Sequence, residues 1–174
     1  MERNALGVQF LPFGEGVLVG NLPYYISTAI ISNFVRAPGR LTEAVFLIQK
    51  EVAERITATP GHREYGYLTV ECQLLAKAEF LFSVPPGAFR PPPRVDSAVI
   101  RLTPFTPPAG LDVDGFLKFV SACFRQKRKM LRNNLSPLYS RELLETRPEM
   151  SQRAEQLSVD QFIDLYKALS APDL

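Results

Sequence analysis

The fold is decided by residues 16–35, which read GVLVGNLPYYISTAIISNFV. Val17-Leu18-Val19 is a short apolar run that ends at Gly20, and it predicts a buried strand. Ser27 or Thr28 can cap a helix that continues to Val35. A strand that leads directly into a helix predicts one unit of an α/β sheet.

The same alternation continues along the chain and favours an α/β sheet with mainly parallel strands. Further strands are predicted at 44–48, 80–84 and 97–102, and further helices at 51–58 and 68–75. Eight of the fifteen prolines lie between Pro85 and Pro108 and indicate a domain boundary. We therefore expect one domain over 1–106 and a second over 107–174.

The second domain is predicted to be small and all-α. A stripe of apolar residues begins at Val113 and ends at Phe124, with Asp112 or Asp114 as the N-cap of its helix. Ser158 and Gln161 form a capping box that opens a last helix.

Composition excludes several classes of protein. The chain has 174 residues, 46% of them hydrophobic, which excludes disorder. Two cysteines and one histidine make a disulfide scaffold, a metal site and a Ser-His-Asp triad improbable; Cys72 and Cys123 are expected in the core. Residues 16–35 carry no charge, but their glycines, polar side chains and Pro23 argue against a membrane span, and Met1–Asn4 does not open a secretory signal. We expect a soluble cytoplasmic protein.

The stretch Asn21-Leu22-Pro23-Tyr24 lies between a predicted strand and a predicted helix, where open α/β sheets bind ligands. Its residue types suit methylation of an exocyclic base amine, which is a poor nucleophile because its lone pair is delocalised into the ring. Two acceptors that hold both N–H bonds, the Asn21 amide oxygen and the Leu22 carbonyl, can aim that lone pair at a methyl group. Pro23 restricts Leu22, and Tyr24 offers a flat face for an extruded base. The alternative is an ordinary turn with an aromatic staple.

Two other stretches fit the same chemistry. Phe89 precedes the stiff run Pro91-Pro92-Pro93 and could cover the second face of the base, or simply cap the core below the loop. Between Asp114 and Glu142 there are seven basic residues and no acidic residue. If one helix continues through this region, Lys118, Arg125, Lys129 and Arg132 share a face that suits phosphate contacts, unless the face is merely solvated.

One glycine pattern is not a cofactor loop. Gly14, Gly16 and Gly20 are spaced almost as in a dinucleotide fingerprint, but they lead into a strand instead of opening a helix.

Taken together, these motifs resemble the ribosomal RNA adenine dimethyltransferases that modify small-subunit RNA. The resemblance covers nearly the whole chain, in order. It runs through Asn21–Ser27, Gln49–Val52, Tyr65-Gly66, Val84–Phe89, Pro91–Val99 and Phe124–Lys129. The macrolide-resistance methylases of large-subunit RNA share the Asn-x-Pro-Tyr element, but 91–99 and 124–129 look like the small-subunit group.

The resemblance implies a Rossmann-like methyltransferase sheet and transfer of methyl groups from S-adenosylmethionine to two adjacent adenosines near the 3′ end of small-subunit RNA, during subunit maturation. By the same resemblance, Asn21, Leu22, Pro23 and Tyr24 hold the target adenine and Phe89 stacks on it. The partner is ribosomal RNA, held by Lys118, Arg125, Lys127, Arg128, Lys129 and Arg132. Asn4 and Asn21 would contact the cofactor. No metal is implied, and a monomer is expected.

The chain also departs from the family pattern. Family members begin with roughly a hundred more residues, the size of about three βα units, which carry the glycine-rich loop for S-adenosylmethionine and the acidic residue for its ribose. We therefore expect the first strands of the sheet to be missing, an exposed sheet edge, and weak cofactor binding by this chain alone. The competing interpretation is a non-catalytic RNA-binding module or ribosome-assembly factor.

Overall fold

A computed structural model describes residues 15–36 and 41–170. The chain divides into two compact units. The first contains the residues up to Thr57 together with Glu71–Thr106, and the second contains Ala58–Val70 together with Pro107–Leu174.

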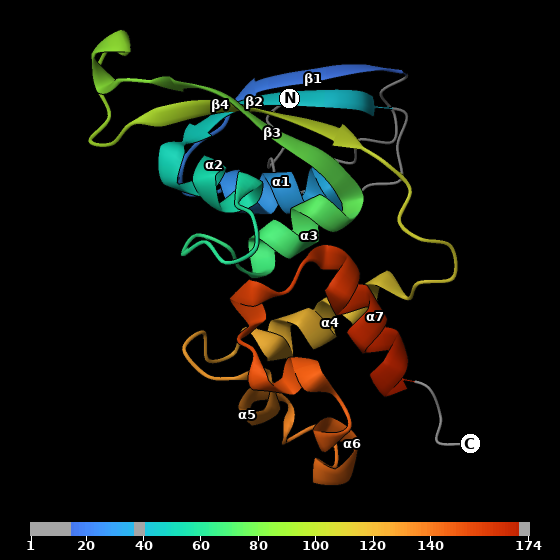
Figure 1. The fold of residues 1–174 in the computed structure, drawn as a ribbon. Helices are drawn as coiled ribbons and strands as arrows, with labels where there is room; N and C mark the ends of the chain where they lie inside the picture. Colours follow the sequence, from blue (N-terminus) through green and yellow to red (C-terminus); the bar gives the residue numbers. More distant parts are fainter. Residues whose placement is uncertain (1–14, 37–40, 171–174) are drawn as a thin grey trace. The chain divides into compact units, whose positions relative to one another are not determined.

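The first unit is built on a four-stranded sheet in the order β1-β2-β4-β3, which confirms the α/β class (Figure 1). Its strands are β1 (Gly16–Asn21), β2 (Leu41–Gln49), β3 (Ala76–Val84) and β4 (Ser97–Pro104).

The expectation of a mainly parallel sheet was wrong for the described strands. β1 and β2 are parallel, but β4 runs antiparallel to both β2 and β3. A parallel pair needs a crossover, commonly a helix, whereas β3 and β4 are joined directly by residues 85–96. β4 therefore returns alongside β3 and pairs between β3 and β2.

Helices cover one face of this sheet (Figure 1). They are α1 (Ser27–Arg36), α2 (Lys50–Thr57) and the end of α3 (Tyr67–Leu75). Alternate residues of β2, including Phe46, are buried, and the Phe34 ring of α1 meets the Phe46 ring edge-on at 5.8 Å. Buried Glu71 of α3 accepts a hydrogen bond from Ser32 and pairs with Arg36, which fastens α3 to α1.

β1 is not the buried strand that its apolar run suggested. Val17 and Val19 are 55% and 73% exposed. β1 lies at the end of the strand order and pairs only with β2 among the described strands. Side chains alternate between the two faces of a strand. Val17 and Val19 therefore lie on one face of β1, which is exposed, and Leu18 lies on the other face, which is partly buried.

The second unit is helical and contains α4 (Val113–Cys123), α5 (Leu131–Leu135), α6 (Arg141–Glu145) and α7 (Val159–Ser170), with short 3₁₀ turns η3 (Pro148–Ser151) and η4 (Ala154–Gln156). Both capping predictions for this unit are confirmed. The Asp112 carboxylate accepts from the Gly115 N–H at 3.1 Å, and Ser158 and Gln161 each accept from the other's backbone N–H. The one for α1 was wrong: α1 begins at Ser27, whose hydroxyl donates to the Tyr24 carbonyl instead of accepting from a backbone N–H.

The long basic helix does not form. α4 ends at Cys123, and residues 124–130 turn before α5 begins, so the four basic residues do not share one helical face. The cause is Asn134, which is buried. Its side-chain amide donates to the Cys123 carbonyl at 2.7 Å, and its oxygen accepts from the Gln126 N–H at 3.1 Å. These bonds replace the ones that another helical turn would supply.

Residues 58–70, which sequence analysis placed in the first domain, belong to the second unit. The buried Tyr65 ring lies 6.3 Å from the Phe124 ring, and the Gly61 N–H donates to the Glu155 carbonyl at 2.7 Å. Burial raises the pKa of the Tyr65 hydroxyl to about 12. These contacts join residues that are more than fifty positions apart in the chain.

Both cysteines are free and buried, as expected, and burial raises the pKa of each thiol. In the described ranges, no group of His, Cys, Asp and Glu is arranged to hold a metal ion. None of the helices described has the length and apolar character needed to cross a bilayer.

Candidate functional site

The segment 21–24 begins with the last residue of β1 and is held by hydrogen bonds on both sides. The Leu22 N–H donates to the Leu47 carbonyl of β2 at 3.0 Å. The Ser27 hydroxyl donates to the Tyr24 carbonyl at 3.1 Å, just where α1 begins. The segment is thus fixed at the carboxyl end of a parallel strand pair, the end at which open α/β sheets bind ligands.

Two hydrogen-bond acceptors of this segment have no donor within the described residues. They are the side-chain oxygen of Asn21, which is exposed, and the carbonyl oxygen of Leu22. We call them the acceptor pair. The Leu22 side chain, in contrast, is buried and packs where Gly20 has no Cβ; a Cβ there would lie 3.2 Å from Leu22 Cδ2. The Leu22 side chain therefore anchors this residue in the core, while its carbonyl oxygen stays available to a ligand.

Tyr24 is joined to the start of β4. Its hydroxyl lies 2.6 Å from the hydroxyl of Ser97, which is fully buried. The neighbouring Asp96 carbonyl accepts from the Lys50 N–H at 3.0 Å, where β2 passes into α2. The ring of Tyr24 is therefore oriented by a residue 73 positions away, to which sequence analysis assigned no role.

We predict that Ser97→Ala and Tyr24→Phe each lower the free energy of unfolding by about 1 kcal/mol, because each removes the same part-buried hydrogen bond. The double variant should cost little more than one single variant, because the bond can be lost only once. Urea unfolding of the four proteins measures this coupling. If the losses in the free energy of unfolding were strictly additive, Tyr24 and Ser97 would not share a hydrogen bond that stabilises the fold.

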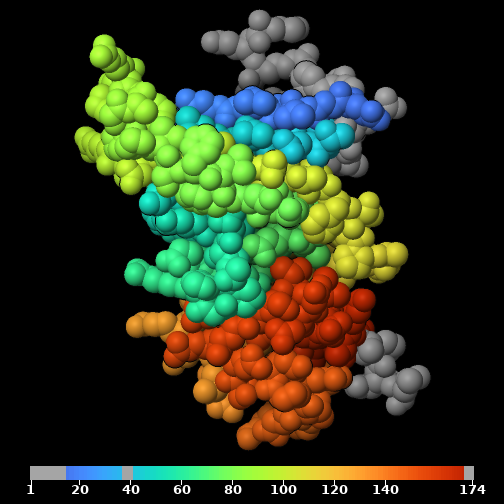
Figure 2. All heavy atoms as spheres, turned by 45° about the horizontal axis from the view of Figure 1, so that its top comes forward, coloured from blue at the N-terminus to red at the C-terminus, as the bar shows by residue number. Residues whose placement is uncertain are grey.

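Phe89 lies on the loop 85–96, which projects beyond the sheet at the end where β1 and β2 finish (Figures 1 and 2). It follows the 3₁₀ turn η2 (Pro86–Ala88), and its N–H donates to the Pro86 carbonyl at 3.1 Å. The residue is half-buried. The loop returns at Ser97, the residue that holds Tyr24.

A small pocket of about 250 Å³ lies beside the base of this loop and is lined by Gln49, Lys50, Glu51, Glu54, Val95 and Asp96. Part of this lining belongs to the motifs Gln49–Val52 and Pro91–Val99. The six lining residues themselves had no predicted place in the site.

All six basic residues predicted to bind RNA are exposed. Lys118 lies on α4 and Arg132 on α5, while Arg125, Lys127, Arg128 and Lys129 lie in the turn between these helices. The Lys127 ammonium donates to the Arg63 carbonyl, so it also supports residues 58–70. Asn4, predicted to contact the cofactor, lies outside the described residues.

Two solved structures that this fold resembles are methyltransferases. A dimethyladenosine transferase from Plasmodium falciparum superposes with a TM-score of 0.82 at 25% identity, over 95% of this chain and 70% of that one. The 23S rRNA methyltransferase ErmE superposes with a TM-score of 0.72 at 26% identity, over 97% of this chain and 70% of that one.

The family follows from the sequence comparison. The Ribosomal RNA adenine dimethylase family model matches residues 4–171, and the chain belongs to this family. Proteins named ribosomal RNA small subunit methyltransferase A are 40% identical in Chlorobium chlorochromatii and 43% identical in Xanthomonas axonopodis pv. citri, over 97% and 95% of this chain. The chain spans 65% of the length of each of these two relatives.

Proposed function

We propose that this chain supplies the base-holding and RNA-binding parts of an enzyme that dimethylates two adjacent adenosines of small-subunit ribosomal RNA. The observation that carries the proposal is the acceptor pair: two acceptors from consecutive residues, without donors from the described chain, at the carboxyl end of β1. Family membership supports adenine as the base, and the names of the relatives support the small subunit.

The acceptor pair acts on the N6 amine of adenine. The Asn21 amide oxygen and the Leu22 carbonyl accept its two N–H bonds, which draws the nitrogen toward tetrahedral geometry and frees its lone pair. S-adenosylmethionine, when bound, supplies the electrophilic methyl group. The amine gives one proton to solvent for each methyl group it receives. Because neither acceptor is a base of suitable pKa, this chain contributes position and polarisation rather than general-base catalysis.

The base itself is held by aromatic side chains. Tyr24, oriented by Ser97, covers one face of the extruded adenine. Phe89 approaches from the projecting loop and covers the other face. Stacking of this kind contributes roughly 1–3 kcal/mol per base.

The described residues account for only part of a site for S-adenosylmethionine. Asn21 is the one cofactor candidate that they include, and a single amide cannot hold a nucleoside with a charged amino-acid tail. We therefore predict that the 174-residue chain binds S-adenosylmethionine weakly or not at all, while a version extended at its N-terminus by the residues that the family resemblance implies binds it normally. Calorimetric titration of both proteins measures this. Micromolar binding by the short chain would contradict the prediction.

The decisive experiment measures tritiated methyl incorporation into unmodified small subunits by the 174-residue chain and by the extended version, which we call the complete enzyme. We expect the complete enzyme to transfer two methyl groups to each of two adenosines. The short chain should transfer none. Large subunits serve as the control substrate, because ErmE is a 23S rRNA methyltransferase. Methylation of the large subunit alone would contradict the choice of substrate.

A non-catalytic RNA-binding module remains the second candidate function. It is favoured by the six exposed basic residues and by the fact that the chain spans 65% of its first relatives. RNA binding without methyl incorporation by the complete enzyme would support the module and overturn the enzymatic proposal.

A further inference from the structure

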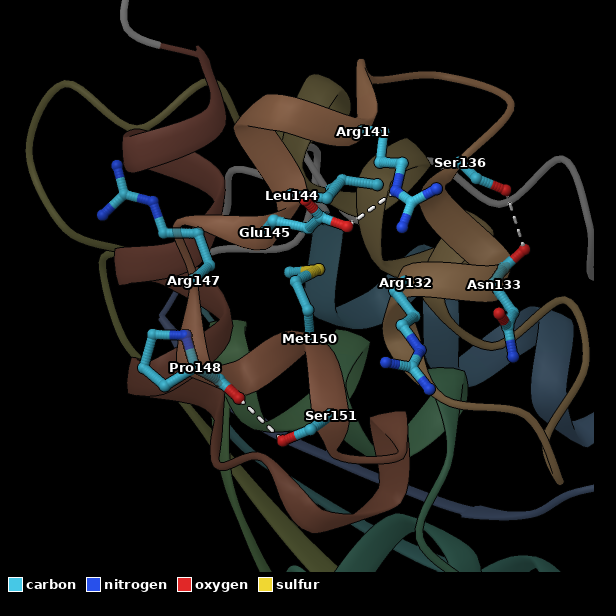
Figure 3. A pocket seen from close by; sticks show the side chains of 10 residues that line it. All are labelled: Arg132, Asn133, Ser136, Arg141, Leu144, Glu145, Arg147, Pro148, Met150 and Ser151. Atoms are coloured by element: carbon cyan, nitrogen blue, oxygen red, sulfur yellow. Dashed lines mark hydrogen bonds and ion pairs between the residues drawn. The ribbon is translucent and has the colours of Figure 1, made fainter.

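The helical unit contains a pocket of about 690 Å³ that the acceptor pair does not use (Figure 3). Its walls come from α5, α6 and η3, elements that are separated by short turns in the chain. A volume of this size falls within the range of small-molecule sites and can hold one nucleotide.

One wall of the pocket is apolar. Leu144 of α6 and Met150 of η3 contribute to the lining although they are only 3% and 4% exposed. In Figure 3 the Met150 side chain extends along the wall, between the residues of α5 and those of α6. A flexible thioether beside an aliphatic side chain is well suited to contact with the face of an aromatic ring.

Another part of the lining is cationic. The guanidinium groups of Arg132 and Arg141 reach from α5 and α6 into the space beside Met150 (Figure 3). Arg141 pairs with Glu145 at 2.6 Å through Nε, which raises its pKa and leaves its terminal N–H groups available. Arg132 forms no ion pair with an acidic residue of the described chain. The Arg147 side chain extends away from both groups (Figure 3).

We propose that this pocket binds one unpaired nucleotide of RNA. The base packs against Leu144 and Met150, and Arg132 and Arg141 bind its phosphate groups. Ser151 and Asn133, at the polar edge of the pocket, are placed to hydrogen-bond the base. A nucleotide within a duplex cannot enter, because its base is stacked and paired. The inference rests on the proposed RNA binding and adds that the helical unit selects RNA with an unpaired position.

The nature of the lining favours a nucleotide over an acidic peptide. A carboxylate-rich peptide would be attracted by Arg132 and Arg141 but would gain nothing from the apolar wall of Leu144 and Met150. A nucleotide matches both the cationic and the apolar side.

The test uses the 174-residue chain and two fluorescently labelled RNA hairpins that differ only in one bulged nucleotide. Anisotropy titrations should show about ten- to hundredfold tighter binding of the bulged hairpin, the range expected from stacking one base. The variant Arg132→Gln/Arg141→Gln should lose this preference; both residues are exposed, so the variant is expected to fold. In the control Lys118→Gln, which lies outside the pocket, affinity for both hairpins should fall while their ratio is kept.

Methionine provides a direct readout, because the chain has only three methionines. With methyl-¹³C methionine, the Met150 resonance, assigned with Met150→Leu, should shift upfield on addition of the bulged hairpin and not of the paired one.

Three outcomes would overturn the nucleotide pocket but not the proposed RNA binding. They are equal affinities for the two hairpins, an unshifted Met150 signal, and a preference for the bulged hairpin that survives in the double arginine variant. Displacement of the bulged hairpin by polyglutamate at lower concentration than by adenylate would assign the pocket to an acidic peptide instead. Failure to bind either hairpin would overturn the proposed RNA binding as well.

Discussion

Replacing Asn21 by alanine in the complete enzyme is expected to lower kcat on the order of 10²–10³-fold, as removal of one positioned hydrogen-bond partner does in other transition states. Asn21 is exposed and its side chain has no partner in the described residues, so its loss should not disturb the fold. The Leu22 carbonyl alone would hold one N–H bond of the amine and leave the lone pair poorly directed.

Single-turnover methylation of small subunits measures the chemical step, and filter binding measures the affinity for RNA, which should stay nearly unchanged. Thr28→Ala is a suitable control, because Thr28 is also exposed and lies close in sequence, in the first turn of α1. Unchanged turnover in Asn21→Ala would remove the catalytic role of this side chain. A parallel fall in RNA affinity would mean that Asn21 serves binding rather than chemistry.

The second large effect is expected from reversing two charges in the turn between α4 and α5. Arg128→Glu with Lys129→Glu should weaken RNA binding at least tenfold at low salt and reduce the slope of log affinity against log salt by about 2, one for each lost phosphate contact. These two residues are preferable to Lys127, because the Lys127 ammonium binds the Arg63 carbonyl and its replacement would also disturb residues 58–70.

Titrations of structured small-subunit RNA at several salt concentrations give this slope. The control variant Lys77→Glu with Lys167→Glu changes the net charge equally at exposed positions outside the basic turn. If both variants gave the same slope, only the total charge would matter. A slope equal to that of the unmodified chain would mean that the side chains of Arg128 and Lys129 are merely solvated.

The site was more predictable than the fold around it, because its parts are local. A strand, a proline and a serine lie within twelve residues, and each acts on its immediate neighbours: Leu18 lies in β1, Pro23 follows Leu22, and the Ser27 hydroxyl binds the Tyr24 carbonyl where α1 begins. Local backbone preferences therefore sufficed to place Asn21 and Leu22 at the end of a strand and before a helix.

The sheet was less predictable, because strand order depends on partners that are distant in sequence. The apolar run in β1 indicates a strand but not its neighbours, and the exposed Val17 and Val19 follow from the position of β1 at the end of the order. The direction of β4 depends on the path of the connection 85–96. The hydrophobic periodicity of the strands does not predict that path.

By itself, the sequence determined the α/β class, the helix caps at Asp112 and Ser158, and the placement of the acceptor pair, since each depends on residues a few positions apart. Tertiary structure alone decided that Ser97 orients Tyr24, that Asn134 ends α4 and so turns the basic segment, and that Arg132, Arg141 and Met150 border one pocket. These features require contacts between side chains of separate elements. The free energy of such tertiary contacts depends on packing geometry rather than on the local preference of any one segment.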